Sequence, residues 1–351
     1  MQKHRLEGLS SFVRDLGSEC TTLIIHNNAL IAGSKDGKIA AWDIDDGREK
    51  WTLQVDGPIS DIAISDRIYV TASAELHAIE IEQGTLEWTK NIGGSSDLVA
   101  LDKDSIWVTS SLYELDVEDY TETTLFQFNK DSKMIKAINF EEKPWFLIMQ
   151  KNELILGVGR PRCGYLAINS EYEIRHKKIK GQSPITLGIE TLSGFLLGHS
   201  NGSITEINDD QVNVIQFEKS PITAAISKEN NWCVGNSDGT IMSSNGWKKG
   251  FVGIIDCLLD VGNFIWASLS NSENNIYLLN RNDGEIQHQI IHDSRIRLMS
   301  NTDDKIAVSD QNGKIMLFEE KILSRRLGEI KEDSDDQLKR DLLKKRLRAL
   351  R

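Results

Sequence analysis

The sequence has no long uninterrupted run of apolar residues. No segment approaches the roughly 18 consecutive apolar residues that a membrane-spanning helix requires. The N-terminal stretch MQKHRLEGLSSFVRDLGSEC contains basic residues but lacks the continuous apolar region of a secretory signal. From these two absences we expect a cytoplasmic protein with no transmembrane segment.

Paired cysteines and common catalytic signatures are also absent. The four cysteines are scattered without a Cys-x-x-Cys pair, so we expect buried or partly buried free thiols. There is no glycine-rich phosphate loop and no Gly-x-Ser-x-Gly nucleophile elbow. His288 and His292 are four positions apart, but along a strand this spacing separates side chains by about 13 Å. The sequence therefore predicts no catalytic residue, no metal site and no enzyme.

The charge of the chain is distributed unevenly. The formal net charge is −12 over 351 residues. Residues 337–351 contain seven basic residues and one acidic residue, so they carry +6 and the preceding 336 residues carry −18. An acidic body argues against DNA wrapping by the main part of the chain, and it leaves the basic tail as a separate element.

Tight turns, by contrast, are abundant. The stretch KDGKIAAWDIDDGREKW (35–51) contains two Asp-Gly pairs, at Gly37 and Gly47, on either side of a short β-compatible segment. Asp-Gly is a strong hairpin signal because a type I′ turn needs positive φ at both central residues. The stretch predicts three consecutive strands. Three strands joined by tight turns cannot bury both of their faces alone, so neighbouring copies of the same unit are needed to cover them.

The same hairpin recurs along the chain. Asp or Asn, then glycine, one further residue and isoleucine occur at Gly37, Gly202, Gly239 and Gly313. Gly202 and Gly239 are 37 residues apart, and Gly239 and Gly313 are 74 apart, which is two repeats. The later turn places Gly47 and Gly84 again 37 residues apart. A repeat of this length, built from short strands and tight turns, is typical of a four-stranded β-propeller blade.

The repeats predict an all-β, eight-bladed β-propeller, with seven blades as the alternative. We expect inner strands near 21–25, 59–64, 97–101, 145–149, 184–190, 222–227, 254–261 and 296–301. Residues in excess of the repeat are expected around 129–144.

The predicted propeller spans 21–330, between an N-terminal segment (1–20) and a C-terminal amphipathic helix (331–351). The ring must close to avoid exposed sheet edges. The last blade, 296–330, is expected to supply its own four strands. Residues 9–16 then either pair with that blade or form a short helix across the junction.

The later turn also carries a family resemblance. AAWDIDDGREKW and AIEIEQGTLEW resemble the repeat of quinoprotein-like (PQQ-like) propellers, and GSKDGKIAAWDI is similar to the WD40 pattern. The matching positions are Ala41, Asp43, Gly47 and Trp51, then Ala78, Glu80, Gly84 and Trp88, with Trp42-Asp43 as the WD dipeptide. The resemblance implies that Trp42, Trp51 and Trp88 help to dock neighbouring blades.

The resemblance also raises the question of a quinone cofactor. A quinone-dependent dehydrogenase would need a cluster of acids and amides to hold Ca²⁺, a catalytic carboxylate and, normally, export. No compact cluster of that kind stands out in the sequence. We therefore expect no cofactor. A small-molecule enzyme or sensor that uses the central channel is kept as an alternative.

Two segments are candidates for partner binding. The loop VGRPRCGY (158–165) presents Arg160 and Arg162, and its alternative is a plain surface loop. The tail EDSDDQLKRDLLKKRLRALR (332–351) predicts a basic amphipathic helix. Its candidate contact residues are Leu338, Leu342, Lys344, Lys345, Arg346, Leu347 and Arg348.

The sequence leaves four alternatives for what the tail contacts. It docks on its own acidic propeller or simply frays in solvent, enters a groove of a partner protein, binds nucleic-acid phosphates through 337–351, or lies on an anionic membrane. The leading hypothesis is a non-enzymatic scaffold that binds a protein partner through its loop faces, its C-terminal helix or both. A nucleic-acid-associated adaptor is the alternative that uses the tail.

Overall fold

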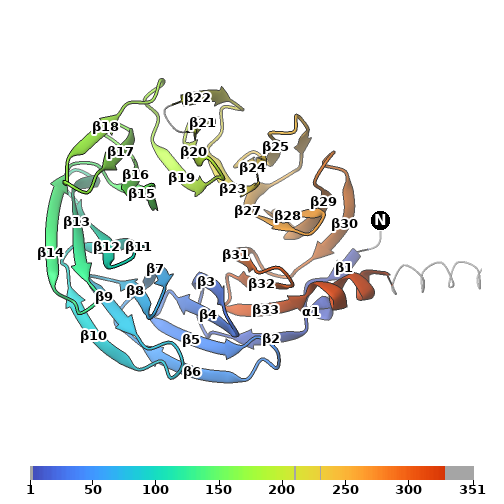
Figure 1. Cartoon of the computed structure of the whole chain (residues 1–351). Coiled ribbons are helices and arrows are strands. Elements are labelled where there is room, and N and C mark those ends of the chain that lie inside the picture. The colour runs from blue at the N-terminus through green and yellow to red at the C-terminus, as the bar shows by residue number, and fades with distance from the viewer. Residues whose placement is uncertain (1–2, 209–210, 230, 329–351) are drawn as a thin grey trace, which may run out of the picture.

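The computed structural model describes residues 3–208, 211–229 and 231–328. Its strands form eight β-sheets that follow one another around a ring, from the first blade in blue to the last in red (Figure 1). The eight-bladed β-propeller is therefore confirmed, and the seven-bladed alternative is wrong. The inner strand of every blade lies where the sequence predicts it.

Blades 1 to 4 each contain four consecutive antiparallel strands, from the innermost to the outermost. Blade 1 consists of β3 (Cys20–His26), β4 (Ala29–Ser34), β5 (Lys38–Asp43) and β6 (Glu49–Gln54). Blade 2 consists of β7 (Ile59–Ile64), β8 (Ile68–Ala72), β9 (Glu75–Ile79) and β10 (Leu86–Asn91). Blade 3 consists of β11 (Ser95–Leu101), β12 (Ser105–Glu114), β13 (Asp119–Asn129) and β14 (Met134–Phe140). Blade 4 consists of β15 (Pro144–Gln150), β16 (Glu153–Val158), β17 (Gly164–Ile168) and β18 (Ile174–Lys177).

Blades 5 to 7 repeat this order, whereas blade 8 has only three consecutive strands. Blade 5 consists of β19 (Ile185–Glu190), β20 (Gly194–His199), β21 (Ser203–Asn208) and β22 (Gln211–Gln216). Blade 6 consists of β23 (Ile222–Lys228), β24 (Asn231–Asn236), β25 (Thr240–Ser243) and β26 (Lys248–Gly250). Blade 7 consists of β27 (Ile254–Val261), β28 (Phe264–Ser270), β29 (Asn275–Asn280) and β30 (Ile286–Ile291). Blade 8 contains β31 (Ile296–Asn301), β32 (Lys305–Asp310) and β33 (Lys314–Glu319).

The N-terminal segment closes the ring. Strand β2 (Phe12–Asp15) pairs antiparallel with β33 and becomes the outermost strand of blade 8. The expectation that blade 8 supplies its own four strands is wrong, and of the two alternatives for 9–16, pairing is the one observed. The short helix α1 (Leu6–Leu9) precedes β2, and β1 (Lys3–Arg5) adds a parallel fifth strand to blade 7. Because β2 and β3 are adjacent in sequence, the chain itself ties blade 8 to blade 1.

Apolar side chains fill the space between each pair of neighbouring blades. The described residues form eight clusters of this kind, one for each junction of the ring. At the junction of blades 1 and 2, for example, Ile39 and Trp51 pack with Ile59 and Val70. Each blade therefore depends on its two neighbours to bury its faces, as expected for a repeat architecture.

The residues in excess of the repeat lie mainly in one hairpin. Strands β12 and β13 contain 10 and 11 residues, whereas every other described strand has between 3 and 8. The expected location around 129–144 is therefore wrong, because the extra length extends the β12–β13 hairpin beyond the ring instead. The sequence of this hairpin has no turn glycine, so the repeat pattern could not locate it.

A helix over residues 320–328 follows β33. Its buried residues Leu323 and Leu327 pack with Leu6 and Leu9, and the Arg326 guanidinium donates hydrogen bonds to the backbone oxygens of residues 9 and 10. The predicted basic helix over 331–351 lies outside the described residues. No helix in the described part of the chain is long and apolar enough to cross a membrane.

Candidate functional site

Trp51 joins blade 1 to blade 2. Its indole N–H donates a 2.8 Å hydrogen bond to the backbone oxygen of Ile81, and only 7% of the residue is exposed. The ring lies against Gly84, where an added Cβ would come within 2.3 Å of the indole. Gly84 also has φ of +68°, so both space and backbone conformation require glycine at this turn. Trp51 and Gly84, which are both positions of the PQQ-like repeat, thus meet across the junction between blades 1 and 2.

The other tryptophans with predicted docking roles also lie at junctions. The half-buried Trp88 of blade 2 donates a 3.3 Å hydrogen bond to the backbone oxygen of Lys130 in blade 3. Trp42 faces the opposite side of blade 1 and packs with Leu317 of blade 8. The six predicted turn glycines all have positive φ, namely Gly37, Gly47, Gly84, Gly202, Gly239 and Gly313.

Sequence reasoning missed a further docking tryptophan. Trp247 of blade 6 donates a 2.9 Å hydrogen bond to the backbone oxygen of Arg281 in blade 7, and its ring lies against Gly284. This contact repeats that of Trp51 with Gly84. It was missed because the turn before Trp247 is shorter, which breaks the spacing of the motif. The signal that could have found it is the weaker Asn-Asp-Gly turn at Gly284.

The two arginines of the loop 158–165 have different environments. Arg162 forms a two-pronged ion pair with Glu142, whose side chain is completely buried. Arg160 is exposed, whereas Cys163 is buried and adopts φ of +54°. Arg160 forms no ion pair with any residue in the described part of the chain, while Arg162 holds the loop to the connection between blades 3 and 4.

Replacing Arg162 by alanine is expected to lower the free energy of unfolding by roughly 2–3 kcal/mol, because the buried Glu142 carboxylate loses its partner. This is less than for a fully buried pair, since about half of the Arg162 side chain is exposed. Arg160→Ala on the same loop is the matched control, with an expected effect within about 0.5 kcal/mol. Urea denaturation measures both. Equal losses in the two variants would contradict the different roles of the arginines.

The extended β12–β13 hairpin carries an exposed apolar surface. Leu115 and Val117 at its turn are 83% and 58% exposed. We call the following set of large exposed residues on blades 3 and 4 the hairpin patch: Leu112, Tyr113, Leu115, Val117 and Trp145. Acidic residues alternate with the apolar ones, namely Glu114, Asp116, Glu118 and Asp119.

Aromatic contacts hold the base of this hairpin in place. The Tyr120 ring lies 5.1 Å from Tyr113 and 6.4 Å from Trp145, in edge-on geometry, measured between ring centroids. The Lys143 ammonium lies 3.7 Å from the centre of the Tyr120 ring and 2.8 Å from the Asp97 carboxylate. The hairpin turn and the loop that carries Arg160 are equivalent turns of adjacent blades, so they project from the same face of the ring.

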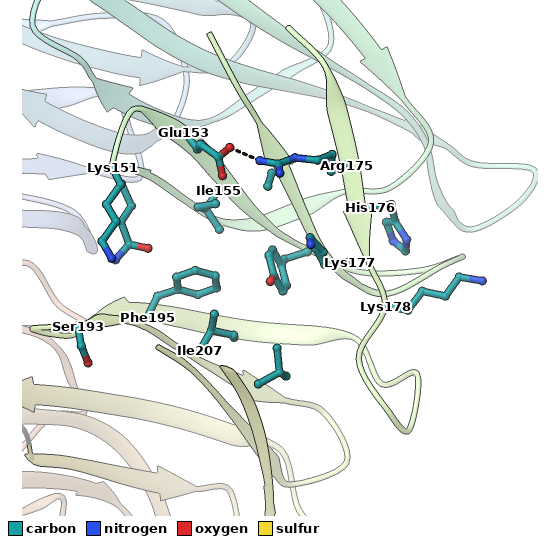
Figure 2. A pocket seen from close by; sticks show the side chains of 14 residues that line it. Lys151, Glu153, Ile155, Arg175, His176, Lys177, Lys178, Ser193, Phe195 and Ile207 are labelled. Atoms are coloured by element: carbon teal, nitrogen blue, oxygen red, sulfur yellow. Dashed lines mark hydrogen bonds and ion pairs between the residues drawn. The ribbon is translucent and has the colours of Figure 1, made fainter. Parts of the chain in front are cut away.

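A cavity of about 570 Å³ opens between blades 4 and 5 at the outer side of the ring (Figure 2). Strand pairing shows why it is open. In blade 1, Trp51 lies opposite Ala41, and in blade 4 the equivalent position opposite Ala167 holds Arg175. Arg175 forms an ion pair with Glu153 instead of filling the junction. The stretch EIRHKKIK (173–180) was not singled out by sequence reasoning, although a run of cations is conspicuous in an acidic chain.

Burial shifts the pKa of several titratable groups. Burial raises the pKa of Cys20 and Cys233 to about 11 and that of Cys257 to about 12, so these thiols stay protonated. Burial also raises the pKa of Asp61 to about 6, while its carboxylate accepts a 3.0 Å hydrogen bond from the backbone of Val99 and so links blades 2 and 3. All four cysteines are free, as predicted. Within 3–208, 211–229 and 231–328, no three His, Cys, Asp or Glu side chains form a group that could hold a metal.

Comparison with known proteins supports the resemblance. A family model described as outer membrane protein assembly factor BamB matches residues 12–132. No curated protein matches the chain. The predicted resemblance to PQQ-like and WD40-like β-propellers is confirmed by the family match and the fold.

Several solved structures share the fold. The computationally designed Ika8 protein has a TM-score of 0.71 and 16% identity, covering 87% of this chain and 98% of its own. Sqt1 from Saccharomyces cerevisiae has a TM-score of 0.73 and 12% identity, covering 91% and 99%. BamB from Moraxella catarrhalis has a TM-score of 0.70 and 12% identity, covering 88% and 99%. At these identities the likeness shows the fold alone.

Proposed function

We propose that the protein is a non-enzymatic interaction scaffold and that it binds a protein partner through the hairpin patch. The observation that carries this proposal is the exposure of Leu115 and Val117 at the end of a hairpin whose base is fixed by aromatic contacts. The β-propeller fold is compatible with such a scaffold. Families of this architecture, such as BamB and WD40 propellers, are generally non-enzymatic.

The chemistry of the hairpin patch indicates what its partner offers. Leaving apolar area in water costs roughly 25 cal/mol per Å², so a partner that covers the turn gains that free energy. The base of the hairpin is already ordered, which reduces the entropy lost on binding. The acidic residues around the turn favour a partner whose apolar groove is bordered by lysine or arginine. Arg160 on the neighbouring blade lies on the same face and accepts an acidic group at the edge of that contact.

A cytoplasmic location is part of the proposal, supported by four free cysteines that need no oxidising compartment. The nucleic-acid alternative depends on 337–351, and the predicted contact residues from Leu338 to Arg348 lie outside the described residues. That alternative stays a prediction. The acidic character of the rest of the chain favours a protein partner over a nucleic acid.

The test is affinity capture from the native cells with two matched double variants. Leu115→Asp with Val117→Asp places two charges on the hairpin turn, and Leu192→Asp with Val252→Asp places two charges on exposed apolar residues elsewhere. We expect a partner captured by the wild type to be lost from the hairpin variant by about tenfold or more and to be retained by the other.

Two outcomes would overturn this assignment. Equal capture by the hairpin variant and the wild type would exclude the hairpin patch as the contact. Loss of the partner from a chain that ends at Gly328, with no effect of the hairpin variant, would assign recognition to the C-terminal tail. Circular dichroism of each variant verifies that the propeller is folded.

A further inference from the structure

The cavity between blades 4 and 5 has an apolar floor. Ile155 and Tyr165 come from blade 4, and Phe195 and Ile207 come from blade 5. The rings of Tyr165 and Phe195 meet edge-on with centroids 5.2 Å apart. In Figure 2, Ile155, Phe195 and Ile207 face one another across the opening. At the junction of blades 1 and 2 the corresponding outer space is filled by Trp51. Here that space stays open above the floor residues, which are themselves 2–7% exposed.

The rim of the same cavity is basic. Arg175, Lys177 and Lys178 follow one another along the outer strand and its exit, and the carboxylate on this side of the opening, Glu153, is paired with Arg175. Neither Lys177 nor Lys178 forms an ion pair in the part of the chain that the structure describes. Lys177 points toward the opening, whereas the Lys178 side chain extends outward from the end of the outer strand (Figure 2). In a chain of net charge −12, this is a local site of opposite sign.

The outer strand adds backbone donors and acceptors. β18 pairs with β17 on one side only, because it is the last strand of its sheet. An edge strand of this kind accepts an extended peptide by strand addition, and the alternate side chains of the peptide then reach the neighbouring surface. The unpaired edge, the apolar floor and the basic rim lie within one cavity of about 570 Å³, a volume suited to a few residues.

We propose that this cleft binds an acidic peptide segment of a protein partner, in which aspartate or glutamate alternates with leucine or phenylalanine. The carboxylates of the segment meet Lys177 and Lys178, and its apolar side chains lie over the floor that contains Tyr165 and Phe195. The apolar floor favours a peptide over a phosphate-rich ligand, because phosphates gain nothing from contact with it. This cleft lies at the outer side of blades 4 and 5, whereas the hairpin turn belongs to blade 3, so the proposal stands independently of the proposed function.

The experiment is a fluorescence-anisotropy titration of the full chain with a short fluorescein-labelled peptide in which Asp and Glu alternate with Leu and Phe. The variant Lys177→Glu with Lys178→Glu reverses the rim, and Lys103→Glu with Lys219→Glu makes the same change of charge at exposed lysines outside the cavity. We expect saturable binding that weakens by about tenfold or more in the rim variant and by less than about twofold in the other. A peptide with alanine in place of Leu and Phe is expected to bind about tenfold more weakly than the parent peptide.

Several results would overturn the proposal. Absence of saturable binding to the wild type, or equal weakening by both lysine variants, would show that no specific peptide site exists in the cleft. Equal binding of the alanine peptide, with displacement by tripolyphosphate, would identify a site for simple anions. Tighter binding of a single-stranded RNA than of the peptide, abolished by the rim variant, would assign the cleft to nucleic acid.

Discussion

Replacing Trp51 by alanine is expected to lower the free energy of unfolding by about 3–5 kcal/mol. The indole is buried between blades 1 and 2, covers Gly84 and donates a hydrogen bond to the backbone of Ile81. Alanine leaves a cavity at the junction and an unpaired carbonyl oxygen. Because each blade is stabilised by its neighbours, loss of this contact weakens the ring as a whole. Guanidinium denaturation monitored by circular dichroism measures the change.

Trp145→Ala is the matched control for this prediction. Trp145 is 47% exposed on the hairpin patch and meets Tyr120 of blade 3 only at its edge, so its replacement is expected to cost less than about 1 kcal/mol. Gly84→Ala tests the same contact by changing the residue that the Trp51 ring covers. An added Cβ would overlap the Trp51 ring, so this variant is expected to be destabilised as well. A Trp51→Ala protein with the melting temperature of the wild type would show that docking does not depend on the indole.

Removal of β2 is expected to abolish the single cooperative unfolding transition. In a chain that begins at Leu16, strand β33 becomes an unpaired edge, and blade 8 keeps only its apolar packing against blade 1 without the strand that continues into that blade. Phe12 packs against Gly47, and the Arg14 guanidinium donates a 2.6 Å hydrogen bond to the Gly47 backbone oxygen. The expected loss is comparable to the total stability of a folded domain, about 5–15 kcal/mol. Size-exclusion chromatography and thermal denaturation detect the open or aggregated state.

A shorter truncation serves as the control. A chain that begins at Leu6 loses β1, which adds a parallel edge strand to blade 7 but does not close the ring, and is expected to remain monomeric and cooperative. A synthetic peptide of residues 3–19 added to the longer truncation is expected to restore part of the cooperative transition, because it can reoccupy the edge of β33. A monomeric chain from Leu16 with unchanged melting would contradict closure of the ring by β2.

The blades were predictable because their signals are local. Asp-Gly and Asn-Gly turns require particular backbone angles, and these turns recur at a fixed interval, so the inner strands could be located from the sequence. The docking role of Trp51 followed from the resemblance, whereas its contact with Gly84 in the next copy of the motif became visible only in the structure. Loss of the motif in later blades did not hide the repeat, because strand and turn signals persist without the tryptophan.

The surfaces were less predictable because they depend on contacts between distant residues. Closure by β2 pairs residues about 300 positions apart, which no local pattern records. The role of Arg162 depends on the burial of Glu142, and burial is a property of the assembled junction. The cleft at Arg175 exists because a docking position lacks its tryptophan, and this becomes visible only when the equivalent strands of different blades are aligned in space.

Site-specific photocrosslinking from the hairpin turn would test the central claim most directly. A photoreactive amino acid at Leu115 samples the hairpin patch, and the same amino acid at Leu192, in the turn between β19 and β20, samples the opposite face of the ring. Both residues are highly exposed, so reactivity differs only if a partner covers one of them. We predict a discrete protein adduct from position 115 in living cells and none of the same mass from position 192. The same adduct from both positions, or none from position 115, would contradict recognition of a partner through the hairpin patch.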